Sequence, residues 1–276
     1  MVSITEYAYE LAAAQPVHGH KAIKSAPIDN ARMLSDMIIA CGRKCKRKPD
    51  IIYIAHSLPF IRGFKDWELN EYFKVPIFYL SGLPCAITHM AVKSASAQIE
   101  KGRYDRILVL GADKAYSDRE RSFFGTVMGD AVIGMMLERG EGLHEVVACR
   151  LDTVLFASEG ENTDQSSIQK YRETLPLLLR DAYRNCLKKS GLNAVDFIAP
   201  HTSSREIWDV FAGMVHMERE RILDGNIART GHFNSNDSFY HYFSHCEDET
   251  IGPGKTAMLI NPGFGGARGC TILRRK

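Results

Sequence analysis

The residue best placed for chemistry in this chain is a cysteine between a predicted strand and a predicted helix. The apolar run VPIFYL ends at Leu80, the turn Ser81–Pro84 follows, and the helix starts at or just after Cys85. The side chains of this helix are small on nearly every side. This is typical of a helix packed between other elements, here between two sheets. The unpaired N–H groups of its first turn would then face the sulfur and favour the nucleophilic thiolate. The alternative is a buried, inert cysteine.

Two segments far apart in the sequence place a histidine after an apolar strand. In KPDIIYIAHS (residues 48–57) it is His56, and in AVDFIAPHTS (residues 194–203) it is His201. Each segment follows a helix that ends in basic residues, so we predict two copies of one α/β unit with a site at their junction. A second matched pair of strands is predicted in DAVIGMMLER and GKTAMLINPG (residues 130–139 and 254–263). Chance similarity between two strand–helix units is the alternative.

Short β-branched strands alternate with helical stretches along the chain, which indicates an α/β protein with covered sheets. The predicted strands are 51–55, 75–80, 106–110, 131–137, 145–151, 195–199, 256–261 and 269–274. The predicted helices are 30–46, 86–101, 173–190, 204–217 and 237–246. No Pro/Ser-rich linker separates them, so we do not expect domains on a tether.

The composition excludes several classes of protein. Of the 276 residues, 45% are hydrophobic, which is enough for a full core. Charged residues make up 25% and the net charge is +2, so the charge balance gives no sign of nucleic-acid binding. The longest apolar runs are too short to cross a membrane, and the N-terminus lacks the pattern of a secretory signal. Seven scattered cysteines favour reduced thiols and a cytoplasmic protein. Cys41 and Cys45 continue an apolar helix stripe and are expected to fill the core rather than bind zinc.

From Ile77 to Arg139 the sequence resembles the nucleophile region of the ketoacyl-ACP synthase III family, within the thiolase superfamily. The likeness continues toward the C-terminus, and agreement in order over about two hundred residues is more specific than any one motif. The matching segments after the cysteine helix are GRYDRILVLGADKAYS (102–117), MGDAVIGMMLE (128–138), DFIAPHTSSREI (196–207), NIARTGHFNSND (226–237) and the Gly-rich hairpin 252–276. The resemblance implies the thiolase fold, layered αβαβα with two pseudo-duplicated halves. We place these halves at residues 1–140, with the nucleophile, and 141–276, with the catalytic histidines.

The resemblance also implies roles for single residues. Cys85 would accept an acyl group from the thioester of an acyl carrier protein or of CoA, and His201 would be the acid–base partner. The N–H groups of Cys85 and Gly266 would stabilise the oxyanion. Apart from the phosphopantetheine that carries the donor, no cofactor is expected, and no metal. On the residues alone, a histidine that satisfies backbone groups at a strand end is the alternative for His201.

One departure from the family pattern lies in the loop that normally supplies an asparagine directly after a glycine. Here Gly231 is followed by His232, so the predicted catalytic set is Cys85, His201 and His232, unless a loop shift brings Asn234 into that place. A Cys-His-His set resembles that of the elongating synthases, which decarboxylate malonyl groups. Replacement of the asparagine also occurs in relatives that only transfer an acyl group to a hydroxyl or amine. The chemistry after acylation is therefore open.

Other departures concern the acyl donor and the neighbouring loops. The stretch between the first strand and the helix near Asn30 is short, and the missing region normally helps to cover CoA, so a carrier protein is the expected donor. The turn at Gly129 reads GDAV where the family has GDGA. Asp237 either orients His232 or caps the following helix, and we expect capping.

Several charged residues are candidates for binding. Arg119 and Arg121 lie where the family places an arginine that meets the phosphate of phosphopantetheine or CoA, and we predict them, with Asn234, as substrate-binding residues. The basic residues of 43–48 are expected to form a solvated helix end rather than a carrier-protein dock. A pair of histidines one helical turn apart, His241 and His245, has no third ligand nearby and is expected to be a polar helix face.

We therefore expect an acyltransferase that passes its acyl group to a small-molecule acceptor in specialised-metabolite or fatty-acyl biosynthesis. The alternatives are a decarboxylative β-ketoacyl synthase and a catalytically silent thiolase-fold partner subunit. The order Cys85, His201, Asn234 also matches papain-like proteases, but the Cys-Gly-x-Cys-Trp run is absent. The family alone implies a homodimer, and neither nucleic acid nor a membrane is an expected partner.

Overall fold

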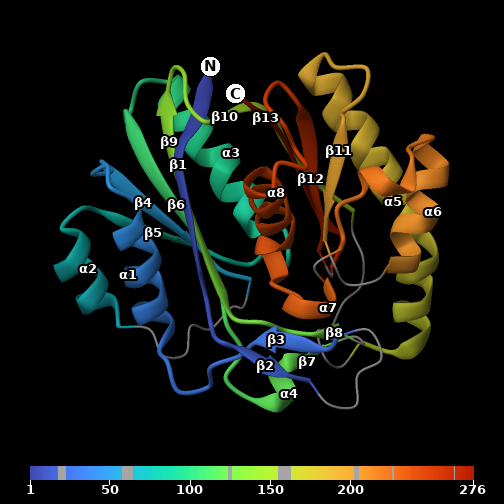
Figure 1. Ribbon diagram of the computed structural model, residues 1–276, viewed down its shortest axis with the longest axis horizontal. Helices are drawn as coiled ribbons and strands as arrows, with labels where there is room; N and C mark the ends of the chain where they lie inside the picture. Colours follow the sequence, from blue (N-terminus) through green and yellow to red (C-terminus); the bar gives the residue numbers. More distant parts are fainter. Residues whose placement is uncertain are drawn as a thin grey trace.

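The computed structural model describes residues 1–17, 23–57, 65–123, 126–154, 163–201, 205–225, 227–263 and 265–276, except the side chains of residues 118, 119 and 123. Its main feature is a nine-stranded mixed sheet that bends into two wings. The wings meet where β1 (Val2–Leu11) lies beside β10 (His144–Thr153) (Figure 1). Only two residue pairs join these strands, Ser3 with Glu145 and Ile4 with His144, so the wings diverge beyond this seam.

The strand order is mirrored about the seam. Outward from β1, the first wing contains β9 (Ala131–Arg139), β6 (Arg106–Asp113), β4 (Ile51–Ala55) and β5 (Ile77–Leu80). Outward from β10, the second wing contains β13 (Ala267–Arg275), β12 (Thr256–Pro262) and β11 (Phe197–Pro200). In both wings the pairs nearest the seam are antiparallel, and the next pair outward, β6–β4 or β12–β11, is parallel.

This mirrored order corrects one sequence-based pairing. The segment 130–139 contains β9, and we expected it to match the segment 254–263, which contains β12. In the structure β9 holds the place that β13 holds in the other wing, and β12 holds the place of β6. Both β9 and β12 are apolar strands, and apolar content alone does not distinguish a parallel from an antiparallel place in a sheet.

Helices cover both wings and fill the space between them (Figure 1). The outer face of the first wing carries α1 (Leu34–Lys44) and α2 (Asp66–Phe73), and that of the second carries α5 (Gln165–Ser190) and α6 (Arg205–Val215). Between the wings lie α3 (Ile87–Glu100) and α8 (Asp237–Glu247). Three separate apolar clusters occupy these three helix layers. The predicted αβαβα layering is confirmed, with α3 between two wings of one sheet rather than between two sheets.

The remaining elements are short and lie mostly in the loops near the wing ends. They are β2 (Ala14–Pro16), β3 (Ser25–Pro27), α4 (Asp118–Arg121), β7 (Ser122–Phe123), β8 (Thr126–Val127), α7 (Ile227–Thr230) and the 3-10 turns η2 (Arg219–Arg221) and η3 (Asn234–Asn236). Neither β1 nor α2 is among the predicted elements. None of the helices in the described ranges has the length and apolar character needed to cross a bilayer.

The two outermost strands of the sheet differ. In the second wing, the outer edge of β11 is occupied, because Ile198 forms a bridge with Ile222 and the Leu223 N–H donates to the Ile198 carbonyl at 2.9 Å. In the first wing, β5 pairs with β4, and no described strand lies on its other side. The sheet therefore has one covered edge and one open edge.

Candidate active site

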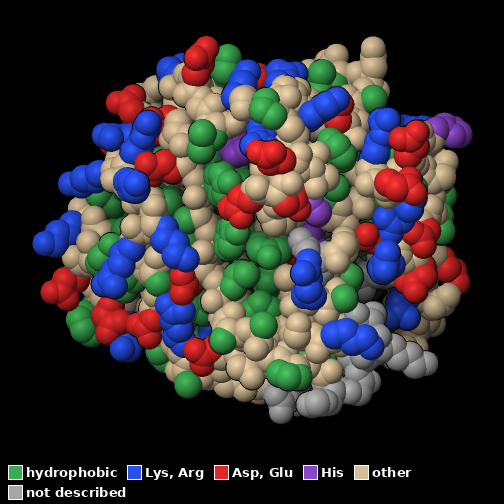
Figure 2. Space-filling view, viewed as in Figure 1, with side chains coloured by type: hydrophobic (Ala, Val, Ile, Leu, Met, Phe, Trp, Pro, Cys, Tyr) green, Lys and Arg blue, Asp and Glu red, His purple; other side chains and the backbone are tan. Residues whose placement is uncertain are grey.

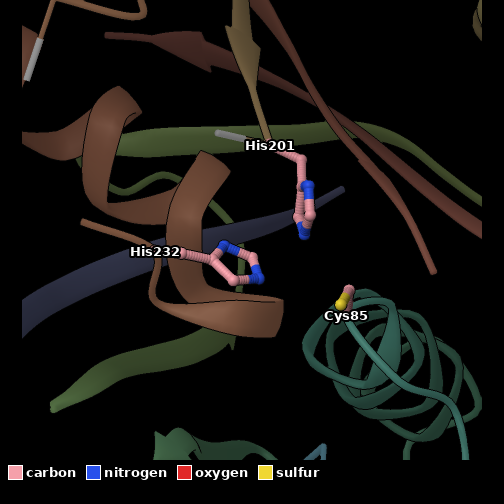
Figure 3. A group of neighbouring side chains, drawn as sticks. All are labelled: Cys85, His201 and His232. Atoms are coloured by element: carbon pink, nitrogen blue, oxygen red, sulfur yellow. The ribbon is translucent and has the colours of Figure 1, made fainter. Parts of the chain in front are cut away.

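Three side chains from different parts of the chain converge in the space between the wings. Cys85 comes from the turn before α3, His201 directly follows β11, and His232 follows α7 (Figure 3). The Cys85 Sγ and one ring nitrogen of each histidine lie within 4.8 Å of one another, and all three residues are buried. The structure thus brings together the three residues predicted as the catalytic set. Their chemical roles stay predictions.

The backbone of Cys85 has an unusual conformation. Its φ is +58°, in the left-handed region, which is uncommon for a residue other than glycine. The Ala86 N–H closes the turn on the Leu83 carbonyl at 3.1 Å, and α3 begins one residue later. No backbone carbonyl of the described residues accepts a hydrogen bond from the Cys85 N–H. That N–H is therefore available to an oxyanion beside the sulfur.

The hairpin between β12 and β13 packs directly on the cysteine turn. A Cβ on Gly263 would lie 2.0 Å from the Pro84 carbonyl oxygen, so only glycine allows this approach. The Tyr171 hydroxyl donates to the Gly263 carbonyl at 3.1 Å and ties the hairpin to α5. The N–H of Gly266 also donates to the Gly263 carbonyl, at 3.1 Å. In this conformation Gly266 is not free to serve as the second oxyanion donor, and its predicted role would require this turn to open.

The backbone of His201 is fixed on both sides. Its N–H donates to the Ile260 carbonyl at 3.0 Å, and its carbonyl accepts the Trp208 indole N–H at 2.6 Å. Its ring meets that of His232 edge to face, with centroids 4.4 Å apart. Burial and the neighbouring His232 lower the pKa of His201 to about 3. The imidazole is therefore neutral at physiological pH and able to accept a proton.

His232 is held by an acidic partner. Its Nδ1 lies 2.5 Å from Oδ2 of Asp237, which also lies 4.0 Å from Nε2 of His201. Burial alone would lower the pKa of His232, but the Asp237 carboxylate and the nearby Cys85 sulfur raise it to about 10. The same contact keeps the pKa of Asp237 below its usual range, although burial opposes this. His232 is therefore a cation at neutral pH, within reach of the Cys85 sulfur.

The capping role expected for Asp237 is wrong. Asp237 is the first residue of α8, and the preceding residue, Asn236, makes no side-chain cap. The second carboxylate oxygen of Asp237 instead accepts the Phe233 N–H at 2.5 Å, which closes the loop around His232. Sequence spacing cannot distinguish these roles, because in both of them Asp occupies the start of the helix.

The loop that carries His232 is anchored to the first half of the chain. The His232 N–H donates to Val127 at 2.8 Å, and the His232 carbonyl accepts the Gly129 N–H at 3.0 Å. Gly231 has a φ of +63°, and a Cβ there would lie 2.3 Å from the Val127 oxygen. A glycine before the histidine is therefore needed for the loop to approach so closely.

Asn234, two residues further on, also faces the cysteine. Its Oδ1 lies 3.8 Å from the Cys85 Sγ, and its backbone is left-handed with a φ of +51°. No loop shift is needed, because His232 and Asn234 both reach the same sulfur. The predicted substrate-binding role of Asn234 is not tested by this contact.

The arginine predicted to bind phosphate is occupied within the protein. Arg121 is buried and makes a bidentate ion pair with Asp130, at 2.8 and 2.9 Å. It also donates to Asn30 and to the Ala115 carbonyl. These contacts favour a structural role for Arg121 in holding the GDAV turn. The side chain of Arg119 lies outside the described residues.

Three groups with an expected structural role are buried or paired within the protein. Cys41 is buried with its sulfur against backbone carbonyls, and burial raises its pKa. His245 pairs with Asp248 at 3.1 Å, while His241 is buried in α8. In the basic segment 43–48, Lys44 pairs with Glu10 and Arg47 with Glu138, each at 2.8 Å.

Two further polar residues bind the site together, and sequence reasoning did not select them. Asp113 accepts hydrogen bonds from the Ser57 N–H at 2.8 Å and the Ser235 hydroxyl at 2.9 Å, linking the two halves. Asn261 contacts the backbone of both the cysteine turn and the histidine loop. Each follows an apolar run at the carboxyl end of its strand, β6 or β12. A polar residue at that place is the signal that could have identified them.

The three converging side chains also have the donor types that zinc prefers, one thiolate and two imidazoles. Around a tetrahedral zinc ion, ligand atoms lie about 3.3–3.8 Å apart. The three ligand atoms lie within 4.8 Å of one another, so this set is also a candidate metal-binding group.

Neither a protein-family model nor a curated protein sequence matches this chain, but many solved structures share its fold. 3-Oxoacyl-[acyl-carrier-protein] synthase III from Aquifex aeolicus superposes with a TM-score of 0.83 at 17% identity, over 99% of this chain and 100% of that one. ChlB3, described as an acyltransferase, gives 0.84 at 16%, over 99% and 97%. Xanthomonas campestris OleA, solved with lauric acid and lauroyl-CoA, gives 0.82 at 14%, over 99% and 98%. The chain therefore has the thiolase fold of ketoacyl-ACP synthase III, as predicted.

Proposed function

We propose that this protein is an acyltransferase of the ketoacyl-ACP synthase III type, which carries an acyl group on Cys85. The observation that supports this most directly is the convergence of one sulfur and two imidazoles within 4.8 Å at the start of α3. A catalytically silent partner subunit has no need for this arrangement. The fold, shared with condensing and acyl-transferring enzymes, is consistent with the same chemistry.

In the first half-reaction, the Cys85 thiolate attacks the carbonyl carbon of an acyl thioester. The His232 imidazolium stabilises the thiolate beforehand, and the Cys85 N–H donates to the oxyanion as it forms. A new C–S bond to Cys85 forms, the old C–S bond breaks, and the departing thiolate takes a proton from His232. This leaves acyl-Cys85, a free thiol and a neutral His232.

In the second half-reaction, His201 acts as the base. It is neutral at physiological pH, so it can accept the proton of an attacking hydroxyl or amine. The acceptor bonds to the acyl carbon, and the Cys85 thiolate leaves. The proton on His201 then returns by way of solvent to His232, which restores the starting ion pair. The opposite pKa shifts of the two histidines support this choice of acid and base.

The runner-up, decarboxylative condensation, fits less well. It would require both histidines to donate hydrogen bonds to the enolate oxygen of a decarboxylated malonyl thioester. The Asp237 carboxylate lies 4.0 Å from Nε2 of His201, so a negative charge already faces the position of that oxygen. Repulsion between these charges favours a neutral nucleophile as the acceptor.

We propose an acyl carrier protein as the donor, because the short stretch before Asn30 leaves less chain to cover CoA. We also propose a homodimer formed through the open edge of β5. This edge carries several exposed aromatic side chains, among them Phe78 at 56% and, on the adjacent α2, Trp67 at 65% exposed. All seven cysteines are free, in keeping with our proposal of a cytoplasmic protein. On the face seen in Figure 2, charges of both signs are intermixed, without the basic stripe expected of a nucleic-acid-binding surface.

The test is intact-mass spectrometry after incubation with acyl carrier protein or CoA thioesters. We expect a stable adduct of one acyl group that disappears in Cys85→Ala and persists in the control Cys45→Ala, where a partly exposed thiol is removed. Adduct formation should be unaffected by EDTA, which distinguishes acyl chemistry from a metal site. Carbon dioxide release from malonyl carrier protein would support the condensing reaction instead. Absence of an adduct with every donor would support the silent partner subunit.

A further inference from the structure

A single buried amide connects the two loops that carry the reactive groups. Asn261 lies near the end of β12 with 0% of its surface exposed. Its Nδ2 lies 2.9 Å from the Cys85 carbonyl oxygen, 3.1 Å from that of Ser235 and 3.4 Å from that of Asn234. An amide nitrogen has two hydrogens for these three acceptors, so one hydrogen is shared. Asn261 thus binds the cysteine turn and the histidine loop at once.

Both of these loops contain a strained residue at the point of contact. Cys85 and Asn234 have φ values of +58° and +51°. Residues other than glycine are uncommon in this region, although asparagine is less so than most, and they persist there where the surroundings fix them. The Asn261 amide contacts the carbonyl of each strained residue. Asn261 therefore holds the backbone of Cys85 and of Asn234 in place. The backbone conformation at these two residues sets the direction in which each side chain points.

The side chain of Asn261 is poorly chosen for stability alone. Its Oδ1 is buried, and the nearby His89 ring interacts with it without forming a hydrogen bond of standard geometry. A buried acceptor that is poorly satisfied destabilises the folded state. A residue that only filled the core would not need this polar atom. The side-chain nitrogen of Asn261 explains why an amide is present. It holds two loops from different halves of the chain in a fixed relative position.

We propose that Asn261 is a positioning residue for the acylation of Cys85. By binding the Cys85 carbonyl and the carbonyls of Asn234 and Ser235, it fixes the separation between the sulfur and His232, which lies two residues before Asn234. It touches neither the substrate nor the reacting atoms. This inference rests on the proposed function for its consequence, but the geometry that it describes also governs the reaction of Cys85 with any electrophile.

The main test compares two substitutions on the same strand. In Asn261→Leu both donors are lost, and we expect the single-turnover rate of Cys85 acylation to fall ~10-fold to ~100-fold, because about 1 Å of misplacement has an effect of that order. The control, Thr256→Val, removes partly buried hydrogen bonds with Asp196 at the other end of β12. We expect Thr256→Val to lose about as much thermal stability as Asn261→Leu. Its acylation rate should nevertheless stay within about 3-fold of that of the wild type. Equal losses in both variants would overturn the proposal.

A second variant separates positioning from folding by its pH dependence. In Asn261→Asp the introduced carboxylate repels the three carbonyl oxygens at neutral pH, whereas its protonated form can donate one hydrogen bond. We therefore expect the ratio of variant to wild-type rate to rise as the pH falls from about 8 to about 5, where a buried carboxyl gains its proton. A ratio that does not change with pH contradicts the proposal.

Alkylation of Cys85 by iodoacetamide distinguishes failure of this inference from failure of the proposed function. If the wild type forms no acyl adduct with any donor, the proposed acyltransferase is wrong. The alkylation rate still depends on how His232 faces the sulfur, so Asn261→Leu should remain slower than Thr256→Val in this assay. If the two variants are alkylated equally fast, Asn261 does not position Cys85, whatever the natural reaction is.

Discussion

Two strained residues, Cys85 and Asn234, face each other across the proposed site. Their left-handed backbones bring the Cys85 Sγ and the Asn234 Oδ1 to 3.8 Å. A backbone of this kind persists where the surrounding structure fixes it. Here it directs the sulfur of Cys85, which lies in the turn before α3, toward both histidines.

At the residue scale, the orientation of His232 depends on one carboxylate. Asp237→Asn removes the negative charge 2.5 Å from Nδ1 but preserves the shape of the side chain. The pKa of His232, now about 10, should fall because burial is then no longer offset. Less imidazolium at neutral pH leaves less positive charge beside the Cys85 sulfur, so acylation at about pH 7 should slow at least ~10-fold.

The measurement is the acylation rate as a function of pH. In Asp237→Asn the rate should decline at a lower pH than in the wild type, because the imidazolium is lost as the pH rises through the reduced pKa of His232. The matched control is Asp248→Asn, which removes a carboxylate from a different histidine, the partly exposed His245. Identical pH profiles for Asp237→Asn and the wild type would show that Asp237 has no effect on the nucleophile.

The sequence identified the reacting groups better than the residues that support them. Cys85 and His201 were selected because each lies at the end of a predicted strand, and His232 because it takes the place of the family's asparagine. The contacts of Asn261 were not predicted, because they join residues that lie 26 or more positions apart in the sequence. Those of Asp237 were not predicted, because capping and contact with His232 both place an aspartate at the start of the helix. Gly266 was matched by motif, and the turn that occupies its N–H could not be foreseen from the glycines alone.

At the scale of elements, most strands and helices could be predicted because their residues are apolar with a clear period. The span of β4 was predicted to the residue, and α3 and α8 within one residue at each end. β1 was not among the strands predicted from the apolar pattern and was implied only by the family resemblance, because its charged residues Glu6 and Glu10 interrupt that pattern. Their partners, among them Arg47 for Glu6 and Lys44 for Glu10, come from the end of α1 and the loop after it. Such partners are known only once the fold is known.

The open edge of β5 gives a prediction about assembly. An exposed edge strand with aromatic side chains is a site for pairing with another chain. Phe78→Glu places a charge at this edge, and we expect it to weaken the proposed dimer at least ~10-fold, the effect typical of losing a central aromatic contact. Sedimentation equilibrium measures the dissociation constant. The control is Val210→Glu on α6, where an equally accessible side chain lies on the opposite wing. A wild-type monomer at all concentrations would exclude the dimer.

At the scale of the whole molecule, buried histidines make the fold sensitive to acid. The pKa is lowered to about 3 for His89 and His201 and to about 4 for His144 and His241, mainly because these side chains are buried. In the unfolded chain a histidine titrates near pH 6.5. Between these values the unfolded state binds more protons, so the free energy of unfolding should decrease as the pH falls below about 6.5. His232 does not oppose this, because its raised pKa contributes fully below that pH and is lost only as the pH rises toward 10.

Urea denaturation between about pH 7 and about pH 4.5 measures this dependence. Of these four histidines, His144 lies at the seam between β1 and β10, away from the proposed site. His144→Phe removes its titrating ring and preserves the aromatic packing against Tyr7 and Phe243. The slope of stability against pH should then fall by roughly a quarter. A slope that is unchanged in this variant, or a wild type that is equally stable at both ends of the range, would show that the buried histidines do not control acid stability.

The difference between the two outer strands has a consequence for higher-order growth. A sheet with two free edges can add copies without limit and form a filament. Here Ile222 and Leu223 already occupy the far side of β11, so among the described residues of the nine-stranded sheet the free outer edge is that of β5. If two copies pair through their β5 edges across a twofold axis, both of these edges are then covered. No further copy can add to the sheet, so growth ends at the dimer. The short segment beside β11 would thus act as a terminator, protecting a chain of mirrored halves from fibrous aggregation.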